Sequence, residues 1–568
     1  MSEGCGRRTG EVTGLRGRGA LRWLAPLLVL GIAAVFRFWA LSRPGTLVFD
    51  ELYYVRDAIS QLAHGFPTVW PDDDPDMSGG RALGFTGTPA NAVHPPLGKW
   101  LIGLGILAFG PDNGWGWRSA VALAGVATVA VTMRLGWLMS RSLVIACTAG
   151  LLLAIDGVHV VLTRVGLLDG FLTLFVALGA LFVWRDGASA APGRHGGIAW
   201  RRPWLLAAGL AFGAAAAVKW SGLYALAGFL VFIAVRDLLT RLRAARAARP
   251  PADDAAGGSG ADRGSGRPAA LGRSVLQALV TAVIAIPAAA LAYLASWTGW
   301  ILNPGGWARE PGVPWPVSLL RYHAEMLAWH STLSAPHPYQ SSPLSWPLAL
   351  RPTSMYRASW SEGCPWAECV STVTPVPNPL VSWGGVAALL ALAVIAVLRL
   401  RAGMRARTAG AGTARAGADA TGPGAGALPV GGRITEGGAA AAVRASDPLV
   451  LASAFVITAY LSGWLPWVLT VSRSAVFQFY AVVLTPFSAL ALALLLGGLC
   501  GVAIRSRDGA EARLLPRSAP GQLRERRISA ALFLAASLAL AVLYLPVWSG
   551  VPIAEWFWRA HMWLPGWA

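Results

Sequence analysis

The sequence predicts an all-α polytopic membrane protein, and three observations carry that prediction. Hydrophobic residues make up 55% of the 568 residues and charged residues only 13%, against roughly 25% charged residues in soluble proteins. The mean hydropathy is +0.53. Many nearly uncharged stretches reach about 20 residues, the length that a helix needs to cross about 30 Å of hydrocarbon. The composition therefore excludes a chain of soluble globular domains.

The positive charge is unevenly distributed along the chain. The net charge is +19 and the pI is near 10.8, but the arginines gather before and between the apolar stretches, as the positive-inside rule predicts for cytoplasmic segments. This pattern indicates contact with anionic lipid rather than with nucleic acid. Segment 41–96 has seven acidic residues against three arginines, so we expect it on the far side of the membrane. The arginine-rich segments are the N-terminus, 236–273, 399–407 and 505–527.

The first elements follow from this charge pattern. Residues 1–21 are expected to form a basic cytoplasmic N-terminus and residues 22–41 the first transmembrane helix, which is retained because no clear small-residue cleavage site follows it. Residues 42–96 then form an extracytoplasmic loop, which we predict to be catalytic. Within this loop, residues 51–62 can form an amphipathic helix that lies on the membrane.

Residues 97–236 form a dense transmembrane block with six apolar segments. Because the chain enters this block outside and leaves it inside, it needs an odd number of crossings, so one segment is re-entrant or merged with a neighbour. A linker over 237–272, rich in Arg, Ala, Gly and Pro, is expected to be cytoplasmic and disordered. The six apolar segments cover about 97–111, 117–138, 142–161, 166–184, 204–219 and 221–236.

The second half is predicted to hold five more spans and a second large loop. Residues 273–299 return the chain to the outside, 300–380 form the second extracytoplasmic loop, and four helices follow within 381–547, for a total of about eleven helices. The two large outside loops are the natural places for chemistry. The remaining segments are cytoplasmic linkers at 401–446 and 501–526 and a Trp-rich extracytoplasmic tail at 548–568, which we expect to lie along the membrane interface.

Two cysteines stand close together in the second outside loop. The spacing of Cys364 and Cys369 permits a small disulfide, which an oxidising exterior would preserve. Because no CxxC partner or pair of histidines accompanies them, we predict no zinc site. We likewise predict no cofactor.

The first outside loop holds two candidate motifs. Adjacent carboxylates, Asp50 and Glu51, follow the first span directly; they can supply a general base or bind a metal ion, although such pairs also occur in loops for solubility alone. His94 and Lys99 flank a Pro-Pro step at the start of the next span. They can form a cationic site for a lipid phosphate, and the alternative is a turn with a lysine that reaches the interface.

A third cluster places four ionisable groups between apolar runs, within residues 156–170. Such groups are costly in hydrocarbon, so they must face a cavity or one another. Arg164 and Asp169 can form a structural ion pair or serve a binding site. Further cations lie at or within apolar segments, and several that converge would suit an anionic headgroup. These cations are Arg118, Lys219 and Arg473.

The second outside loop concentrates histidines and aromatic residues. His330, His337, Tyr339 and Trp346 lie within it, and three of the chain's eight histidines lie in this loop. Their spacing is not the compact spacing of metal ligands. We therefore predict a polar, aromatic surface that closes over a substrate, and no metal site.

Taken together, these segments resemble a known family, the dolichyl- or polyprenyl-phosphate-mannose protein mannosyltransferases in their bacterial form. The similar segments run in order from residue 49 to about residue 490 and so cover most of the chain. They are Phe49-Asp-Glu-Leu-Tyr-Tyr54, His94-Pro-Pro-Leu-Gly-Lys99, the cluster Asp156–Gly170, Val218-Lys-Trp-Ser-Gly-Leu-Tyr224, Ser345-Trp-Pro-Leu348 and Arg473-Ser-Ala-Val-Phe-Gln-Phe-Tyr480.

The resemblance implies a GT-C type glycosyltransferase fold with about eleven transmembrane helices. It implies inverting transfer of mannose from polyprenyl-phosphate-mannose to Ser or Thr hydroxyls of secreted proteins, at the plasma membrane. The family places the general base on Asp50, and Glu51 then orients Asp50 or the acceptor. The second loop, of about 80 residues, is too short for the β-trefoil domain of fungal members. Residues expected to bind the lipid phosphate or sugar are His94, Lys99, Arg118, Arg164, Asp169, Lys219 and Arg473.

Two other functions remain as alternatives. The first is a transferase of the same fold that passes a lipid-phosphate sugar to a lipid or a cell-wall glycan. The second is a transporter, which the lack of visible internal repeats disfavours. The expected partners are polyprenyl-phosphate-mannose, Ser/Thr-containing polypeptides, membrane lipids and the secretion channel. A Mg or Mn ion at Asp50 and Glu51 is the alternative to metal-free transfer.

Overall fold

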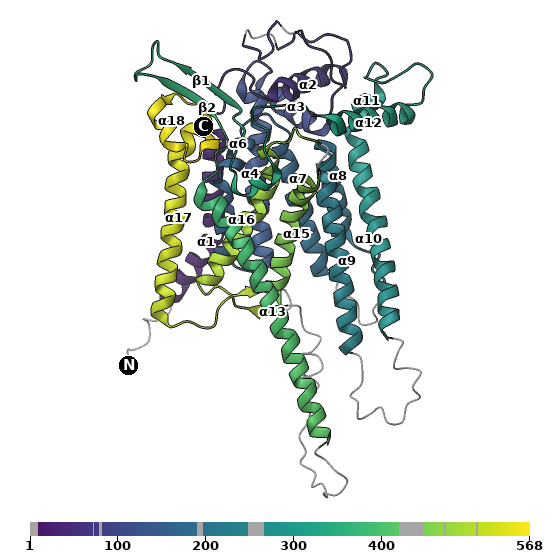
Figure 1. Cartoon of the computed structure of the whole chain (residues 1–568), viewed down its shortest axis with the longest axis vertical. Helices are drawn as coiled ribbons and strands as arrows, with labels where there is room; N and C mark the ends of the chain where they lie inside the picture. Colours follow the sequence, from purple (N-terminus) through teal and green to yellow (C-terminus); the bar gives the residue numbers. More distant parts are fainter. Residues whose placement is uncertain are drawn as a thin grey trace, which may run out of the picture.

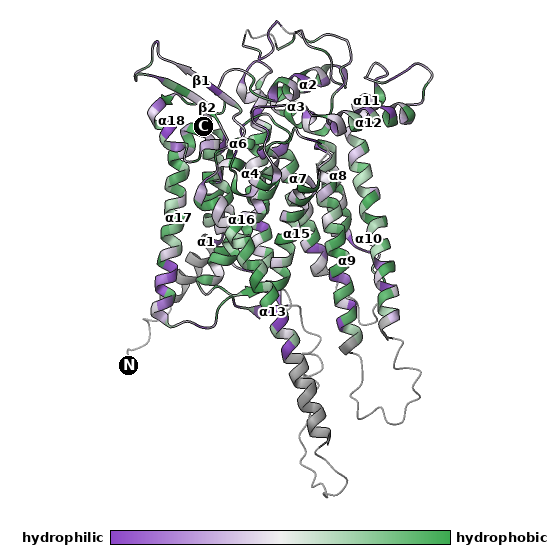
Figure 2. Cartoon of the chain, in the orientation of Figure 1, coloured by the Kyte–Doolittle hydropathy of each residue, from purple (hydrophilic) through white to green (hydrophobic). Residues whose placement is uncertain are grey.

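The computed structural model describes residues 9–71, 73–78, 82–189, 197–247, 266–334, 336–419, 447–470, 473–506 and 509–568. Long helices run side by side between the two ends of a bundle (Figure 1). The short helices and the longest strands gather at one end, drawn uppermost, which we call the loop end. The opposite end, which we call the basic end, carries the arginine-rich ends of the long helices. Hydrophobic residues dominate the helices between these two ends (Figure 2).

The first half of the chain supplies helices α1 to α10. A short, half-buried helix, α2, follows α1 at the loop end, and a run of closely packed helices follows it. Their bounds are α1 Thr9–Phe38, α2 Glu51–His64, α3 Leu97–Phe109, α4 Gly114–Ser140, α5 Leu143–Ala154, α6 Gly157–Leu162, α7 Asp169–Ser189, α8 Pro203–Val218, α9 Gly222–Ala247 and α10 Gly266–Ser296.

The second half begins with short elements at the loop end and continues with long helices. Strands β1, β2 and β5 form an antiparallel sheet in the order β1-β2-β5. The elements of this second half of the chain are α11 Thr298–Leu302, α12 Trp315–Thr332, η3 Pro343–Leu348, β1 Tyr356–Trp360, β2 Cys369–Val373, α13 Pro379–Asp419, α15 Pro448–Leu469, η4 Gln478–Leu484, α16 Thr485–Leu499, β3 Ile504–Arg505, β4 Glu511–Ala512, α17 Pro520–Ser549, β5 Ile553–Ala554, α18 Glu555–His561 and η5 Pro565–Trp567.

The predicted class, an all-α multi-pass membrane protein, is confirmed. Among the described residues, eight helices are long and apolar enough to cross a membrane, and three more apolar helices, α3, α5 and α8, are shorter. The total of about eleven spans therefore stays a prediction. The eight long helices are Gly114–Ser140, Asp169–Gly187, Gly222–Ala245, Pro268–Ser296, Pro379–Arg405, Pro448–Leu469, Gln478–Leu499 and Pro520–Ser549.

The apolar segment expected over 142–161 is two helices rather than one. Helix α5 ends at Ala154, and Asp156 then caps α6 by accepting a hydrogen bond from the His159 backbone N–H at 2.8 Å. An Asp at this position satisfies a backbone donor that the first turn of a helix leaves free, so it starts a new helix. Ser382 of α13 donates to the other Asp156 oxygen at 2.9 Å. The cap therefore also fixes where α13 packs.

The linkers predicted at the basic end are partly helical. Helix α9 continues to Ala247 and α10 begins at Gly266, so both ends of the linker predicted over 237–272 are ordered helix. Ala and Arg have high helix propensity, which overrides the low-complexity signal there. Similarly, α13 extends to Asp419, into the linker expected at 401–446. Residues 248–265 and 420–446 lie outside the described part of the chain.

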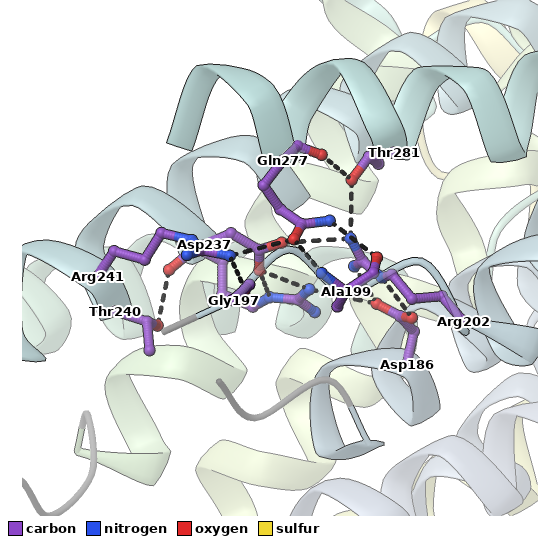
Figure 3. Close-up of polar contacts among 10 residues, drawn as sticks. Asp186, Gly197, Ala199, Arg202, Asp237, Thr240, Arg241, Gln277 and Thr281 are labelled. Atoms are coloured by element: carbon purple, nitrogen blue, oxygen red, sulfur yellow. Dashed lines mark hydrogen bonds and ion pairs between the residues drawn. The ribbon is translucent and has the colours of Figure 1, made fainter. Parts of the chain in front are cut away.

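A buried ion network ties α7, α8, α9 and α10 together near the basic end (Figure 3). Arg202, at the start of α8, donates to Asp186 of α7 at 3.0 Å and to Thr281 of α10 at 2.7 Å, and it pairs with Asp237 of α9 at 3.4 Å. The Arg202 and Asp186 side chains are each 1% exposed. Removing one partner of such a pair leaves a buried charge and costs about 3–5 kcal/mol. The four helices are thus fixed to one another at the end away from the loops.

Close backbone approach completes this packing. A Cβ placed on Gly213 of α8 would lie 2.3 Å from the carbonyl oxygen of Ala289 in α10. Only glycine allows the two backbones to approach so closely. Helix α8 is therefore held tightly against α10, and its C-terminal end at Val218 is fixed at the loop end.

At the loop end, the β1–β2 hairpin pairs Tyr356 with Val373 and Trp360 with Cys369. Cys364 and Cys369 form a disulfide that closes the tip of this hairpin, as their spacing permits. Helix α12 lies across the loop end (Figure 1) and leaves Leu320 and Leu327 exposed. Aromatic and aliphatic side chains exposed on such a helix are typical of a membrane interface.

Candidate active site

The candidate site lies at the loop end, where α2 begins. Asp50 precedes the first residue of α2, yet its side chain makes no capping hydrogen bond to the helix backbone. One of its oxygens, Oδ2, accepts a hydrogen bond from the Tyr54 hydroxyl at 3.3 Å. Phe49 adopts a positive φ of 50°, which is uncommon outside glycine and is typical of functional sites. The Asp50 carboxylate therefore contacts the Tyr54 side chain of α2 and does not cap the helix backbone.

The neighbouring carboxylate, Glu51, is fully engaged with the protein. The Arg118 guanidinium donates to both of its oxygens at 2.8 Å, and the backbone N–H groups of Val48 and Gly166 donate to them at 3.0 and 2.6 Å. The Glu51 side chain is 0% exposed and that of Arg118 is 1% exposed. Glu51 therefore joins α2, α4 and the chain before α7.

All five N–H groups of Arg118 donate hydrogen bonds within the protein. Two reach Glu51, and the other three donate to the carbonyl oxygens of Leu41, Pro44 and Thr46 at 3.2, 2.9 and 2.9 Å. An arginine has five N–H donors and no acceptor. Arg118 was expected to bind the lipid phosphate, but here it holds the chain that connects α1 to α2.

Arg164 has a similar structural position. Its guanidinium donates to the carbonyl oxygens of Phe36 and Arg37 at 2.8 and 2.9 Å. These are among the last carbonyls of α1, which have no partner within the helix. Arg164 therefore caps α1, and it does not form the alternative ion pair with Asp169, because that carboxylate pairs with Lys219.

Lys219 lies at the break between α8 and α9. Its ammonium group is 3.1 and 3.0 Å from the two oxygens of Asp169, the first residue of α7, and it lies 4.4 Å from the centre of the Tyr480 ring. Lys219 is 5% exposed. Lys219 is the extended residue that follows the apolar helix α8. Its charged side chain therefore lies at the loop end and not within the apolar part of the bundle.

Arg473 is a cation whose described partners are all neutral. Its Nε donates to the Ala475 carbonyl oxygen at 2.9 Å, one terminal nitrogen lies 3.2 Å from His330 Nδ1, and the other donates to the Tyr480 hydroxyl at 3.3 Å. The side chain is half-buried. A half-buried guanidinium with no carboxylate partner is a suitable site for an anionic ligand.

His94 and Lys99 lie beside this group but differ in their contacts. The His94 ring is 5.1 Å from the His330 ring and 5.8 Å from the Tyr54 ring, measured between centroids. Lys99 instead pairs with Asp57 of α2 at 3.0 Å and donates to the His94 carbonyl oxygen at 3.2 Å. His94 thus faces the site, whereas Lys99 ties α3 to α2.

The residues predicted to form an acceptor surface separate into two groups. His337 packs edge-on against Phe49, at 6.2 Å, and its Nδ1 accepts a hydrogen bond from the Tyr339 backbone N–H at 3.1 Å. Trp346 is 2% exposed and packs behind the Tyr480 ring at 5.9 Å. His337 and Tyr339 therefore lie next to the turn that carries Asp50, whereas Trp346 supports the wall behind it.

The surroundings shift the acidity of the groups at the loop end. Burial raises the pKa of Asp50 to about 6, although the Lys219 charge and the Tyr54 hydrogen bond partly oppose this shift. Burial also lowers the pKa of His94 well below its usual range, and it lowers the pKa of His330 to about 4. Asp50 is thus a carboxylate at neutral pH that holds a proton more readily than an ordinary aspartate.

Two tyrosines that the sequence analysis did not select belong to this site. Tyr54 is one helical turn after Asp50, and the i, i+4 spacing would have indicated a contact between their side chains. Tyr480 lies in an apolar segment, and nothing in its local sequence indicates that it meets both Lys219 and Arg473. Conversely, Asp156 and His159 do not join the site, since they cap α6 and contact Arg37 of α1.

The groups brought together are the Asp50 carboxylate, the Lys219–Asp169 ion pair and the Arg473 guanidinium, whose described partners are neutral. Among the described parts of the chain, no group of three or more His, Cys, Asp or Glu side chains is placed to hold a metal ion. A carboxylate beside cations, at one end of an apolar helical bundle, can remove a proton and stabilise an anionic leaving group. The fold and the site define a membrane glycosyltransferase of the GT-C class.

One solved structure supports the fold, and family models support the class. The S. cerevisiae protein O-mannosyltransferase Pmt1–Pmt2 complex, solved with its sugar donor bound, has the same fold, with a TM-score of 0.65, 14% identity, and coverage of 96% of this chain and 92% of that chain. The model of the dolichyl-phosphate-mannose-protein mannosyltransferases matches residues 86–303. The model of the C-terminal four-helix membrane region of protein-O-mannosyltransferase matches residues 317–415.

Bacterial relatives match over nearly the whole chain. The polyprenol-phosphate-mannose–protein mannosyltransferase of Mycobacterium tuberculosis is 31% identical, covering 96% of this chain and 92% of its own length. The enzyme of the same name from Corynebacterium glutamicum is 26% identical, covering 95% and 92%. This chain therefore belongs to the dolichyl-phosphate-mannose-protein mannosyltransferase family.

Replacing Glu51 by Ala is expected to destabilise the protein by about 3–5 kcal/mol, because it leaves the Arg118 charge buried without a partner. The measurement is the melting temperature of the purified protein in detergent. The matched control is Glu310→Gln, which removes a partner of Arg321 in a pair whose side chains are 59% and 50% exposed, and it should leave the melting temperature unchanged. Equal melting temperatures for Glu51→Ala and wild type would contradict the structural role of Glu51.

Proposed function

We propose that this chain transfers mannose from polyprenyl-phosphate-mannose to Ser or Thr hydroxyls of secreted polypeptides, with Asp50 as the general base. The observation that carries the proposal is the different environment of the two adjacent acids. Among the described residues, four hydrogen-bond donors reach the Glu51 carboxylate, whereas one, the Tyr54 hydroxyl, reaches that of Asp50. Asp50 is therefore the acid available to a substrate.

The reaction is a single displacement. The acceptor oxygen attacks the anomeric carbon of mannose while the bond from that carbon to the phosphate oxygen breaks, with the electron pair leaving on the phosphate. The hydroxyl proton passes to Asp50, so polyprenyl phosphate and a mannosylated side chain are formed. Attack and departure on opposite faces invert the anomeric carbon. A hydroxyl is a weak nucleophile near neutral pH, and a positioned carboxylate contributes about 100-fold to 10,000-fold to such a step.

The leaving phosphate gains negative charge, and Arg473 is the cation best placed to meet it. Its described partners are neutral, so its charge is available to the donor. Lys219 shares its charge with Asp169 and can bind the sugar or phosphate at the same time. Arg118 and Arg164 act indirectly, because their N–H groups hold the segment that carries Asp50.

This chemistry needs no metal ion. A lipid monophosphate can be stabilised by nearby cations alone, and both oxygens of Glu51 are already bound by Arg118 and backbone N–H groups. Asp50 and Glu51 therefore do not converge on one ion. We expect EDTA to leave the transfer rate unchanged.

The site is proposed to face away from the cytoplasm at the plasma membrane. The arginine-rich segments belong to the basic end, where the positive-inside rule places the cytoplasm, and the loop end lies opposite (Figure 1). The N-terminus is then cytoplasmic. Acceptors would reach the site as extended chains, and the secretion channel is the partner that would deliver them.

The direct test is transfer of radiolabelled mannose from polyprenyl-phosphate-mannose to a Ser/Thr-rich peptide by membranes that contain the protein. Asp50→Asn should lose at least about 100-fold in rate while keeping the wild-type melting temperature, because Asn has nearly the same shape and its amide oxygen can still accept the Tyr54 hydrogen bond. A parallel set contains EDTA.

The possible results separate the parts of this proposal. Wild-type transfer that persists in Asp50→Asn would exclude Asp50 as the base. Consumption of the donor lipid without labelling of peptide would assign a lipid or glycan acceptor instead. Loss of transfer with EDTA, restored by a divalent ion, would contradict metal-free transfer.

The pH dependence gives an independent prediction. Because the base must be ionised and its pKa is about 6, kcat/KM should fall as the pH drops through about 6 and reach a plateau above it. Tyr54→Phe removes a hydrogen bond that lowers the Asp50 pKa, so the acid limb should move to higher pH. The matched control is Tyr53→Phe, since Tyr53 is 66% exposed and its loss should leave the limb in place. An acid limb near pH 4 in the wild type would exclude a buried base.

A further inference from the structure

His330 joins three segments that are far apart in the sequence. It lies near the end of α12, its Nε2 is 2.8 Å from the Val93 carbonyl oxygen, and its Nδ1 is 3.2 Å from a terminal nitrogen of Arg473. Val93 belongs to the chain just before α3, and Arg473 to the chain just before η4. This histidine therefore contacts the cation that the proposed reaction needs.

The two contacts fix the tautomer of His330. A carbonyl oxygen can only accept a hydrogen bond, so Nε2 carries the proton. Nδ1 faces a guanidinium, which can only donate, so Nδ1 is unprotonated. A doubly protonated ring would set an N–H against the N–H of Arg473. Burial and the charges of Arg473 and Lys219 lower the pKa of His330, in agreement with a neutral ring.

The contact with His330 completes the orientation of Arg473. Among the described residues, Ala475, His330 and Tyr480 take one N–H each, from Nε and from the two terminal nitrogens. One N–H then remains on each terminal nitrogen. When His330 and Tyr480 take the outer N–H groups, the two that remain lie parallel at the end of the guanidinium and can bind two oxygens of a phosphate.

Helix α12 has a separate anchor that does not involve Arg473. The Tyr322 hydroxyl is 3.0 Å from the backbone nitrogen of Ala92 and 3.1 Å from its carbonyl oxygen. Tyr322 is 3% exposed. His330 is therefore not the sole contact that holds α12 to the chain before α3. Its contact with Arg473 can serve a purpose other than holding α12 in place.

We propose that His330 is a positioning residue for the donor, which holds Arg473 with its two remaining N–H groups directed at the lipid phosphate. His330 was predicted from the sequence to belong to an acceptor surface, and we now assign it to the donor side of the site. It rests on the proposed function, because the phosphate is that of the proposed donor. His330 touches neither the sugar nor the acceptor in this account.

Two substitutions separate the two contacts of His330. Asn places an amide oxygen near the position of Nδ1, so His330→Asn keeps an acceptor for Arg473 and loses the bond to Val93. Gln reaches further and places an amide N–H near Nε2, so His330→Gln keeps the bond to Val93 and leaves Arg473 without its acceptor. The third variant, Tyr322→Phe, weakens the docking of α12 and leaves Arg473 untouched.

The measurements are KM for polyprenyl-phosphate-mannose, KM for the peptide, the Kd of polyprenyl phosphate, and the melting temperature. His330→Gln should raise the donor KM and the Kd by about tenfold, the typical effect of losing a hydrogen bond to a charged group, with the peptide KM unchanged. His330→Asn should stay within about threefold of wild type in all three constants. Tyr322→Phe should lower the melting temperature alone.

A second arm tests whether His330 acts through Arg473. In an Arg473→Lys background, where the fork is absent, His330→Gln should cause no further loss of donor affinity, because residues that act as one unit are not additive. Full additivity would overturn the proposal. So would the reverse order of the two variants, with His330→Gln similar to wild type and His330→Asn impaired.

The outcomes also distinguish this inference from the proposed function. If the wild type moves no mannose but binds polyprenyl phosphate, the proposed function fails while the Kd values still test His330. If transfer is normal and the donor constants of His330→Gln equal those of wild type, the inference fails alone.

Discussion

The buried pair between Glu51 and Arg118 is the interaction on which the rest of the site depends. It joins the start of α2 to α4, and the remaining N–H groups of Arg118 hold the segment that connects α1 to α2. A buried ion pair is stable only when hydrogen bonds satisfy its remaining atoms, and here the backbone supplies them. Whereas Glu51 is held in this way, the half-buried Asp50 side chain next to it accepts a single hydrogen bond among the described residues, from Tyr54.

The charged residues of the loop end divide into those that build the site and those that face it. Arg118, Arg164 and Lys99 are engaged by carbonyl oxygens or carboxylates within the protein. Lys219 and Arg473 lie where long helices break or have not yet begun, so their side chains reach the loop end. The long helices hold the loop-end residues in place. They are fixed to one another by close contacts such as that of Gly213 with Ala289 and by the ion network near the basic end (Figure 3).

The sequence was sufficient for the fold class and for the order of the motifs, because apolar length and charge distribution are local properties. It also placed Asp50 next to a candidate partner acid. It could not show how the cations are paired, because the partner of Arg118 is 67 residues away and that of Lys219 is 50 residues away. The break after α5 was missed for a different reason. The sequence shows an Asp at position 156 within an apolar segment, but it does not show that this Asp ends one helix and begins another.

We propose that Arg473, and not Arg118 or Arg164, binds the donor phosphate beside Asp50. The most direct measurement is an experimental structure of the protein with polyprenyl-phosphate-mannose bound. We expect phosphate oxygens within hydrogen-bond distance of the Arg473 guanidinium, and the Asp50 carboxylate on the face of mannose opposite the phosphate. A phosphate bound to Arg118 or Arg164, with the Glu51 pair broken, would contradict it.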